Sequence, residues 1–321
     1  LCYLMGVVLL YGAFGTLDLY ALGQSVGKGA LEQAALVLMA FGLLLKTAVF
    51  PLHFWLPPAH SSASAPVSAL LSALVVKGSF YILFRLWVEV FHGMVTPGFG
   101  LAMGVLGAMA IVWGSVQALR QRRLKMLVAH STVAQLGYLM FLFPLTAAAP
   151  VVGGELSPWV LEASKGTLYQ ILAHALAKAS LFLAAGNLML AHGSDEIAAL
   201  RGLAGRMPFS VFTVALAGFS LIGLPPSGGF VAKWLLLHAV IGLNQWWWVP
   251  FLIGGGLLTA GYLVRVLHPA LLKSEGGKPA GLQACAFTLA LLSLLSGVLA
   301  NDLLWLMPIG SPFSPGTGGA P

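Results

Sequence analysis

Long hydrophobic runs, separated by short polar or glycine- and proline-rich connections, make up most of this chain. A hydrocarbon core of about 30 Å needs about 20 apolar residues in a helix, and most of the runs are close to that length. In sequence order, the predicted elements are 1–16, 30–52, 66–87, 98–119, 126–146, 167–191, 208–243, 248–267 and 281–306. The pattern therefore predicts an all-α polytopic membrane protein, a bundle of about nine or ten transmembrane helices.

The element 208–243 is too long to cross a bilayer as one helix, because 36 residues would extend about 54 Å. It contains Pro225 and Pro226 within a run rich in glycine, and proline removes a backbone donor and clashes with the preceding turn. We therefore predict two helical pieces around an unwound turn.

A second break is predicted at Pro51, which closely follows Lys46. The stretch 51–66 that follows is rich in proline, histidine and small residues. Irregular backbone at membrane depth is tolerated only where protein or a wet cavity surrounds it. The two breaks therefore predict two discontinuous helices that line a cavity.

Composition agrees with the hydrophobic pattern: 59% of the residues are hydrophobic, 8% are charged, and the mean hydropathy is +0.93. The net charge of +7 does not indicate nucleic-acid binding, because the basic residues lie between spans and form no basic tail. Cys2 and Cys285 each fall in an apolar run, so no disulfide, metal site or cofactor is predicted.

Basic residues between the elements predict the orientation of the chain. The positive-inside rule assigns the richer side to the cytoplasm or its equivalent. That side carries Arg120, Arg122, Arg123, Lys125, Arg201, Arg206, Arg265, Lys273 and Lys278, and the other carries Lys28, Arg85 and Lys165. We expect a short amphipathic helix over 194–206 on the basic face, and an aromatic belt at 246–248 on the opposite face.

Four lysines fall inside the predicted elements: Lys46, Lys77, Lys178 and Lys233. An ammonium at bilayer depth costs about 2.5 to 3.5 kcal/mol in insertion measurements, so intramembrane lysines indicate a function in moving charge. Lys46 and Lys178 lie near the middle of apolar windows, where snorkelling does not reach water. Snorkelling remains an alternative for Lys77, and Lys233 is expected to face the cavity at the second break.

Gln170, His174 and Lys178 have the spacing i, i+4, i+8, which places them on one helical face. A polar stripe facing lipid would be costly, so this face is expected to point into the bundle. Histidine titrates near neutrality, and such a stripe could pass protons through bound water. The alternative is a histidine that hydrogen-bonds two helices together.

Other polar residues are assigned supporting positions. His53 and His60 lie in the irregular stretch after Pro51, and His130 opens the fifth element together with Ser131, Thr132 and Gln135. That position suggests capping and helix contacts near a surface. The acidic residues fall at predicted element ends, so the chain supplies internal cations without internal carboxylates: Glu89, Glu155, Glu162 and Asp302.

Five motifs, in order, resemble one family: the antiporter-like subunits of respiratory complex I, membrane-bound hydrogenases and Mrp-type cation/proton antiporters, in which the Mrp D component has this type. The motifs lie at 46–71 (beginning Lys-Thr-Ala-Val-Phe-Pro-Leu-His-Phe-Trp-Leu-Pro-Pro-Ala-His), 75–78, 124–138, 174–186 and 223–233 (Gly-Leu-Pro-Pro-Ser-Gly-Gly-Phe-Val-Ala-Lys). The resemblance covers most of the chain.

The resemblance implies two inverted repeats, two broken helices and a lysine and histidine axis along the membrane plane. It implies that Lys46 and Lys233 handle protons on the broken helices, and that Lys77, His174 and Lys178 continue the axis between them. It also implies further helices ahead of Leu1, one carrying a buried glutamate that pairs with Lys46. We expect a truncated version of this fold, with an incomplete first repeat at 1–97, a second repeat at 98–268 and a C-terminal helix and tail at 269–321.

The sequence thus favours a proton-translocating subunit without a catalytic site of its own, in a complex I-like, hydrogenase-like or Mrp-like assembly. Expected partners are the lipid bilayer, protons with sodium as an alternative, and other membrane subunits, one of which could supply the glutamate. The expected location is a bacterial or archaeal inner membrane. The competing interpretation is a structural membrane module whose lysines only dock partner helices. Redox chemistry at haem or quinone is disfavoured because the histidines do not pair across spans.

Overall fold

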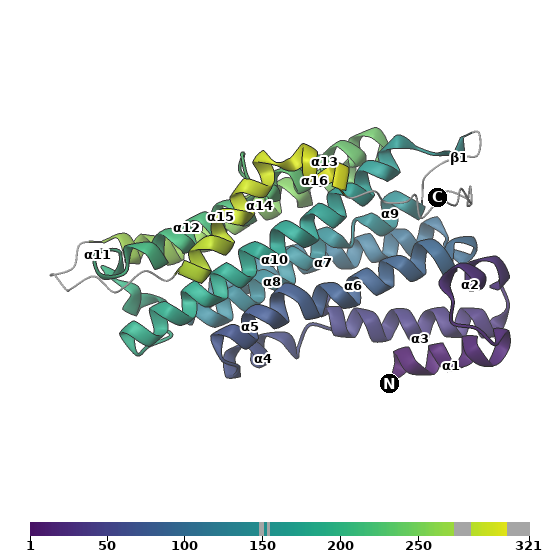
Figure 1. Ribbon diagram of the computed structural model, residues 1–321, viewed down its shortest axis with the longest axis horizontal. Coiled ribbons are helices and arrows are strands. Elements are labelled where there is room, and N and C mark those ends of the chain that lie inside the picture. Colours follow the sequence, from purple (N-terminus) through teal and green to yellow (C-terminus); the bar gives the residue numbers. More distant parts are fainter. Residues whose placement is uncertain (148–150, 153–154, 273–283, 307–321) are drawn as a thin grey trace.

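A computed structural model describes residues 1–147, 151–152, 155–272 and 284–306. The α-helices are α1 (Cys2–Phe14), α2 (Leu19–Ser25), α3 (Ala30–Thr47), α4 (Leu56–Ser62), α5 (Ala65–Leu70), α6 (Val76–Arg85), α7 (Pro97–Arg120), α8 (Leu124–Leu139), α9 (Leu142–Ala147), α10 (Pro158–His192), α11 (Leu203–Arg206), α12 (Pro208–Ile222), α13 (Gly228–Gly242), α14 (Val249–Leu271), α15 (Ala284–Val298) and α16 (Ala300–Leu306). Most of the long helices run side by side along the long axis of the molecule (Figure 1).

Short elements connect these helices. They are the π-helical turns η1 (Leu71–Val75) and η2 (Leu86–Val90), and the 3-10 turns η3 (His92–Met94), η4 (Ile197–Leu200) and η5 (Trp246–Trp248). Two two-residue strands, β1 (Val151–Val152) and β2 (Glu155–Leu156), pair antiparallel with Val151 opposite Leu156. The fold is otherwise helical, as the hydrophobic pattern predicts.

Six helical segments are long and apolar enough to cross a membrane, and a seventh results if α1 and α2, bent by 66°, count as one span. Three shorter apolar helices, α12, α13 and α15, add to these. The predicted break in 208–243 is present, since α12 ends at Ile222 and α13 begins at Gly228. The all-helical polytopic fold with discontinuous helices is therefore confirmed.

The first break also follows the sequence. Helix α3 ends at Thr47, Ala48 adopts a left-handed conformation with φ 58°, and turns lead through Pro51 to α4. A bend at residues 63–64 then separates α4 from α5. The first discontinuous element therefore comprises α3, α4 and α5, with α4 as a short helix between two interruptions.

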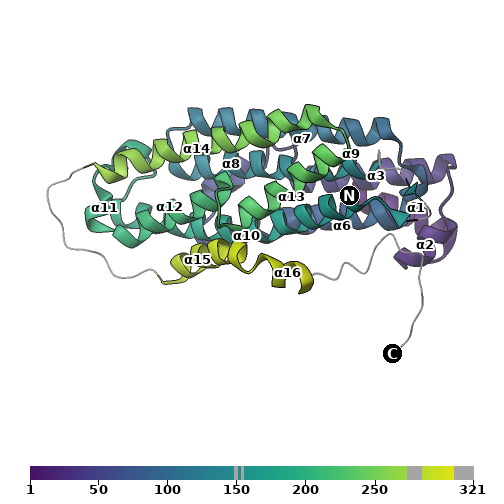
Figure 2. The same ribbon diagram turned by 90° about the horizontal axis from the view of Figure 1, so that it is seen from above.

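Helix α8 lies at the centre of the bundle. Every residue of α8 except Met126 and His130 is buried. It packs against α7, α10 and α4, and its apolar residues belong to both hydrophobic cores of the described chain. Viewed from above, α7 and α14 lie along one face of the bundle and α15 and α16 along the opposite face (Figure 2).

Three expectations about local structure are wrong. Residues 194–206 do not form one surface helix: they contain the turn η4 and the short helix α11, and the apolar residues of these turns are buried in the core. Helix α10 is longer than predicted, 35 residues from Pro158, because Pro158 fits the first helical turn and nothing interrupts the chain before Gly193. Of the predicted aromatic belt, Trp246 and Trp247 are exposed but Trp248 is buried. Lys273 and Lys278 lie outside the described residues.

Candidate functional site

Lys233 occupies the second break. Its amine donates hydrogen bonds to the carbonyl oxygens of Leu221 at 2.7 Å and Ile222 at 2.9 Å, and it lies 4.5 Å from the centre of the Tyr138 ring. Carbonyl groups at a helix C-terminus have no intrahelical partner, and a cation there interacts favourably with the helix dipole. Lys233 therefore binds the free end of α12, as its expected position at the cavity suggested.

Gln135 of α8 joins four helices at the same place. Its side-chain amide lies 3.2 Å from the Leu221 carbonyl oxygen and 3.3 Å from the hydroxyl of Thr259 in α14, and donates to both. The amide of Gln170 in α10 donates to the Gln135 oxygen at 3.1 Å. Because Leu221 accepts from both Gln135 and Lys233, the polar path from α10 reaches the second break through hydrogen bonds.

A second hydrogen-bonded group holds Lys178. The amine of this fully buried lysine donates to the Val128 carbonyl oxygen at 3.0 Å and to the hydroxyl of Ser131. Thr132 donates to the same carbonyl at 3.1 Å and contacts the Ser72 hydroxyl at 3.1 Å. Lys178 is therefore linked through α8 to the π-helical turn η1.

Lys77 completes this group. Its side chain is 3% exposed, and its amine donates to the carbonyl oxygen of Ser72, five residues earlier. The snorkelling alternative is therefore wrong for Lys77, because the amine turns back into η1 instead of extending to water. π-helical turns often occur at functional sites because they leave a carbonyl out of the regular ladder.

His174 lies between the two groups. It is 2% exposed, and the charges of Lys77, Lys178 and Lys233 all act on its ring. Neither ring nitrogen has a hydrogen-bond partner among the described residues. A buried polar group of this kind normally binds ordered water, so the site has two nitrogen positions at which water could connect the groups.

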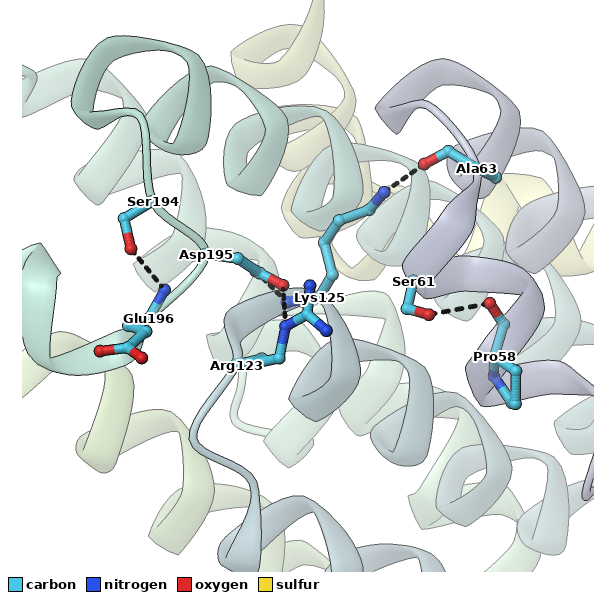
Figure 3. Close-up of polar contacts among 8 residues, drawn as sticks. All are labelled: Pro58, Ser61, Ala63, Arg123, Lys125, Ser194, Asp195 and Glu196. Carbon is cyan, nitrogen blue, oxygen red and sulfur yellow. Dashed lines mark hydrogen bonds and ion pairs between the residues drawn. The ribbon is translucent and has the colours of Figure 1, made fainter.

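The basic end of the bundle contains a third lysine contact, which the sequence does not predict. Lys125, expected at the surface, is 5% exposed, and its amine donates to the carbonyl oxygen of Ala63 at the bend after α4 (Figure 3). Asp195, from the connection after α10, accepts from the Lys125 backbone at 3.0 Å and from Arg123 at 3.1 Å. The first turn of α8 is thus tied to both the first break and the end of α10.

The three supporting histidines lie near the first break. His60 is fully buried, stacks on Phe182 of α10 at 4.5 Å, and has no hydrogen-bond partner for either ring nitrogen among the described residues. The charges of Lys178, Lys77 and Lys125 act on His60. His53 accepts a hydrogen bond from Trp113 at 3.2 Å and interacts electrostatically with His130. The structure therefore brings His60 to the lysines and pairs His53 with His130.

Lys46 does not lie where the sequence analysis places it. It occupies the last turn of α3, and its side chain is exposed. Among the described residues it has no hydrogen-bond or ion-pair partner. The expectation of a mid-helix, buried lysine is wrong because the helix ends one residue later, at Thr47, which puts Lys46 at a helix end.

The prediction of a surface role for the start of the fifth element is also wrong. Ser131, Thr132 and Gln135 are fully buried and bind the axis residues. Two of them, Ser131 and Gln135, have the same i, i+4 spacing as the stripe on α10, and that spacing could have identified them. Nothing local in the sequence distinguishes Lys125 from the neighbouring surface arginines.

Among the acidic residues, Glu89 pairs with Arg85, and Glu162 pairs with His238 at 2.7 Å. Asp302 is exposed, and the side chain of Glu155 lies outside the described residues. Within the described part of the chain, no three histidine, cysteine, aspartate or glutamate side chains gather as metal ligands would. The described axis therefore consists of lysine, histidine, glutamine and hydroxyl groups.

Comparisons with known proteins identify relatives of this chain. NADH-quinone oxidoreductase subunit N of Desulforudis audaxviator (strain MP104C) is 37% identical over 276 residues, which are 84% of this chain and 52% of the relative. A Na(+)/H(+) antiporter subunit of Alkalihalophilus pseudofirmus is 38% identical over 246 residues, 75% of this chain and 30% of the relative. The chain thus spans about half, or less, of the length of these curated relatives.

Solved structures share the fold. A chain of the Mrp complex from Dietzia sp. DQ12-45-1b matches with a TM-score of 0.81 at 24% identity, over 95% of this chain and 64% of that one. A chain of respiratory complex I from Thermus thermophilus matches with a TM-score of 0.70 at 25% identity, over 94% of this chain and 64% of that one. The arrangement of helices is therefore that of a known class of membrane subunits.

The family model described as "NADH:quinone oxidoreductase/Mrp antiporter, TM" matches residues 1–259. That match covers both broken helices and every residue of the polar path. Together with the apolar spans, it shows that the chain is an integral, multi-pass membrane protein. The chain belongs to the NADH:quinone oxidoreductase/Mrp antiporter transmembrane family.

Proposed function

We propose that this chain is a proton-translocating, antiporter-like subunit of a multisubunit membrane complex. The observation that carries the proposal is a buried polar path inside helices that are apolar enough to span a bilayer. The path runs from Lys77 through Ser72, Thr132 and Lys178 to His174, and from Gln170 through Gln135 to Lys233. Ionisable groups at this depth are expensive and mark ion pathways.

The chemistry of the path suits protons. No carboxylate of the described residues pairs with the buried amines of Lys77, Lys178 or Lys233, whose hydrogen bonds go to neutral oxygens. The proton affinity of such an amine changes strongly when a charge approaches or leaves. A lysine that gains or loses an acidic neighbour elsewhere in the complex therefore takes up or releases a proton. His174, between the three lysines, carries the proton across the gap through bound water.

We assign the exposed Lys46 a partner outside the described chain. Its position in the last turn of α3 leaves the amine accessible to a carboxylate from another membrane segment, of this polypeptide or a neighbouring subunit. Complexes of the complex I, hydrogenase or Mrp type supply such neighbours, and relatives named for sodium/proton antiport keep sodium as an alternative ion. We retain the division into repeats at 1–97 and 98–268 as part of this proposal, with a bacterial or archaeal cell membrane as the location.

The test is proton pumping by the reconstituted complex that contains the chain. We expect Lys178→Ala and Lys233→Ala to abolish pumping while the complex still assembles. The matched control is Lys165→Ala, which removes a half-exposed lysine from the same helix as Lys178. Pumping at an unchanged rate in both axis variants contradicts the proposal.

One observation favours a second function, that of a structural module. The amines of Lys77, Lys178 and Lys233 all donate to backbone carbonyls, and a permanently charged lysine that only ties helices together would do the same. In that case water does not reach Lys178, and a charge-reversing swap with an acidic residue of a partner subunit restores assembly. Isotope exchange at the Lys178 amine, detected with labelled lysine, separates the two functions.

A further inference from the structure

A cavity of about 490 Å³ opens on one face of the bundle, away from the polar path. Its walls are hydrophobic side chains of α7 and α14, the turn η5, and Phe50 of the first break. The two helices lie along the same face of the molecule (Figure 2). None of its lining residues belongs to the lysine and histidine axis, so the proposed function gives this cavity no role.

The cavity has the length and direction of one leaflet of a bilayer. At one end lies Trp247, which is exposed in the aromatic run that suits a membrane–water interface. Along α7 the lining continues from Leu101 to Trp113, twelve residues or about 18 Å at the helical rise. Half of a hydrocarbon core is about 15 Å thick, so the cavity extends from the interface to the middle of the membrane.

The cavity is continuous with the lipid-facing surface. Val105, Met109 and Val112 recur at helical spacing on α7, and each is 43–44% exposed although it lines the cavity. A helix with its side chains is about 10 Å across and could enter this space only by its side chains. A single acyl chain can enter along the whole length, and the hydrophobic walls have no hydrogen bonds to offer to water.

The deep end of the cavity meets the first break. Phe50 and Trp113 line it there, with ring centres 5.7 Å apart. Trp113 donates its indole hydrogen bond to His53, and Phe50 stacks on the same imidazole at 5.5 Å. Whatever fills the cavity therefore packs against the two aromatic side chains that hold His53.

From this geometry we propose that the groove between α7 and α14 binds one phospholipid acyl chain. The headgroup of that lipid lies at the Trp246–Trp247 rim, and the methyl end of the chain contacts Phe50 and Trp113. The bound chain supports the aromatic pair that orients His53. The site is independent of proton translocation, and its occupancy is measured without any transport.

The test uses the complete membrane complex, reconstituted with phospholipid that carries a photoactivatable diazirine at the methyl end of one acyl chain. After irradiation and proteolysis, mass spectrometry identifies the labelled residues. We expect labels concentrated on 112–116 and on Phe50, and their loss in Val105→Trp and in Met109→Trp, either of which fills the groove. Two separate filling variants keep the test valid if one of them fails to assemble.

The matched control is Leu257→Trp, a substitution on α14 at a side chain that is 70% exposed and does not line the cavity. It should leave the label on 112–116 unchanged. Labels spread evenly over all lipid-facing residues, or unaffected by the filling variants, overturn the proposal. So does an unlabelled groove crosslinked to another protein segment, because a helix then covers it.

Discussion

The two breaks in the bundle solve the same problem with lysines from different places. At the second break the lysine comes from the broken element itself: Lys233 of α13 binds the carbonyl oxygens of Leu221 and Ile222. At the first break, Lys125 of α8 reaches the Ala63 carbonyl from 62 residues away, while Lys46, which belongs to the broken element, is exposed. In both, an ammonium satisfies carbonyls that an interrupted helix leaves free.

The difference shows that a lysine's place in the sequence does not decide which break it serves. The resemblance to the family pairs Lys46 with Lys233 as equivalent lysines, but in the described chain only Lys233 contacts its break. The contact at the first break is anchored instead by Asp195, which binds the start of α8 and Arg123. The first break is therefore stabilised by three segments, and the second by neighbouring residues together with Gln135.

Removing Lys233 should produce the largest effect. In Lys233→Met the Leu221 and Ile222 carbonyls lose their cation, and an unsatisfied buried polar group costs about 1–3 kcal/mol. We expect a loss of proton pumping and a lower thermal unfolding midpoint of the reconstituted complex. Lys233→Arg, which keeps the donor, should retain more of the stability. A variant that pumps and unfolds as the original chain does would show that the second break needs no cation.

Gln135→Leu should come next. The substitution removes the amide that joins Gln170, Leu221 and Thr259, and it leaves the Leu221 carbonyl to Lys233 alone. We expect slower pumping, because the hydrogen-bonded path from α10 is interrupted, and a loss of stability of about 1–3 kcal/mol. Gln135→Glu, which keeps the acceptor for Gln170, is the control. Equal pumping rates in all three proteins would remove Gln135 from the path.

Lys125→Met should affect the first break more than pumping. Ala63 loses its donor, with a cost of about 1–3 kcal/mol, but the path from Lys77 to Lys233 does not pass through Lys125. Hydrogen exchange should become faster at the backbone amides of 65–70, while Lys125→Arg keeps them protected. If exchange rises instead at the second break, the two breaks are coupled and the comparison must be revised.

Lys46→Met should change stability least. The side chain is exposed and has no partner within the described chain, so the unfolding free energy should stay within about 0.5 kcal/mol. Pumping should nevertheless fall if Lys46 meets a carboxylate elsewhere in the complex. Lys28→Met, at another exposed lysine, serves as the control for both measurements. A large loss of stability would mean that Lys46 is already buried against a neighbour in the complex.

Local patterns were good predictors wherever the helix itself decides the outcome. The run around Pro225 and Pro226 predicted the second break, because proline cannot continue the hydrogen-bond ladder. The spacing of Gln170, His174 and Lys178 predicted one face, and all three are buried. The proton-handling roles of these residues stay predictions.

Patterns failed where a distant segment decides the environment. Lys125 lies in a basic cluster and has the pattern of a surface charge, yet α4 and α5 cover it. Ser131 and Gln135 follow that cluster and have the pattern of capping residues, but α8 is surrounded by other helices. No property of these residues alone reports which helices pack around them.

The amino-acid sequence by itself determined the membrane environment, the helical elements, the positions of the breaks and the presence of intramembrane lysines, since these depend on hydrophobic length and on proline and glycine chemistry. Only the tertiary structure decided which lysine binds which break, which hydroxyl and amide groups join them, and that Lys46 stays exposed. Hydrogen bonds between helices depend on how the helices pack, and packing brings together residues such as Ala63 and Lys125 that are far apart along the chain.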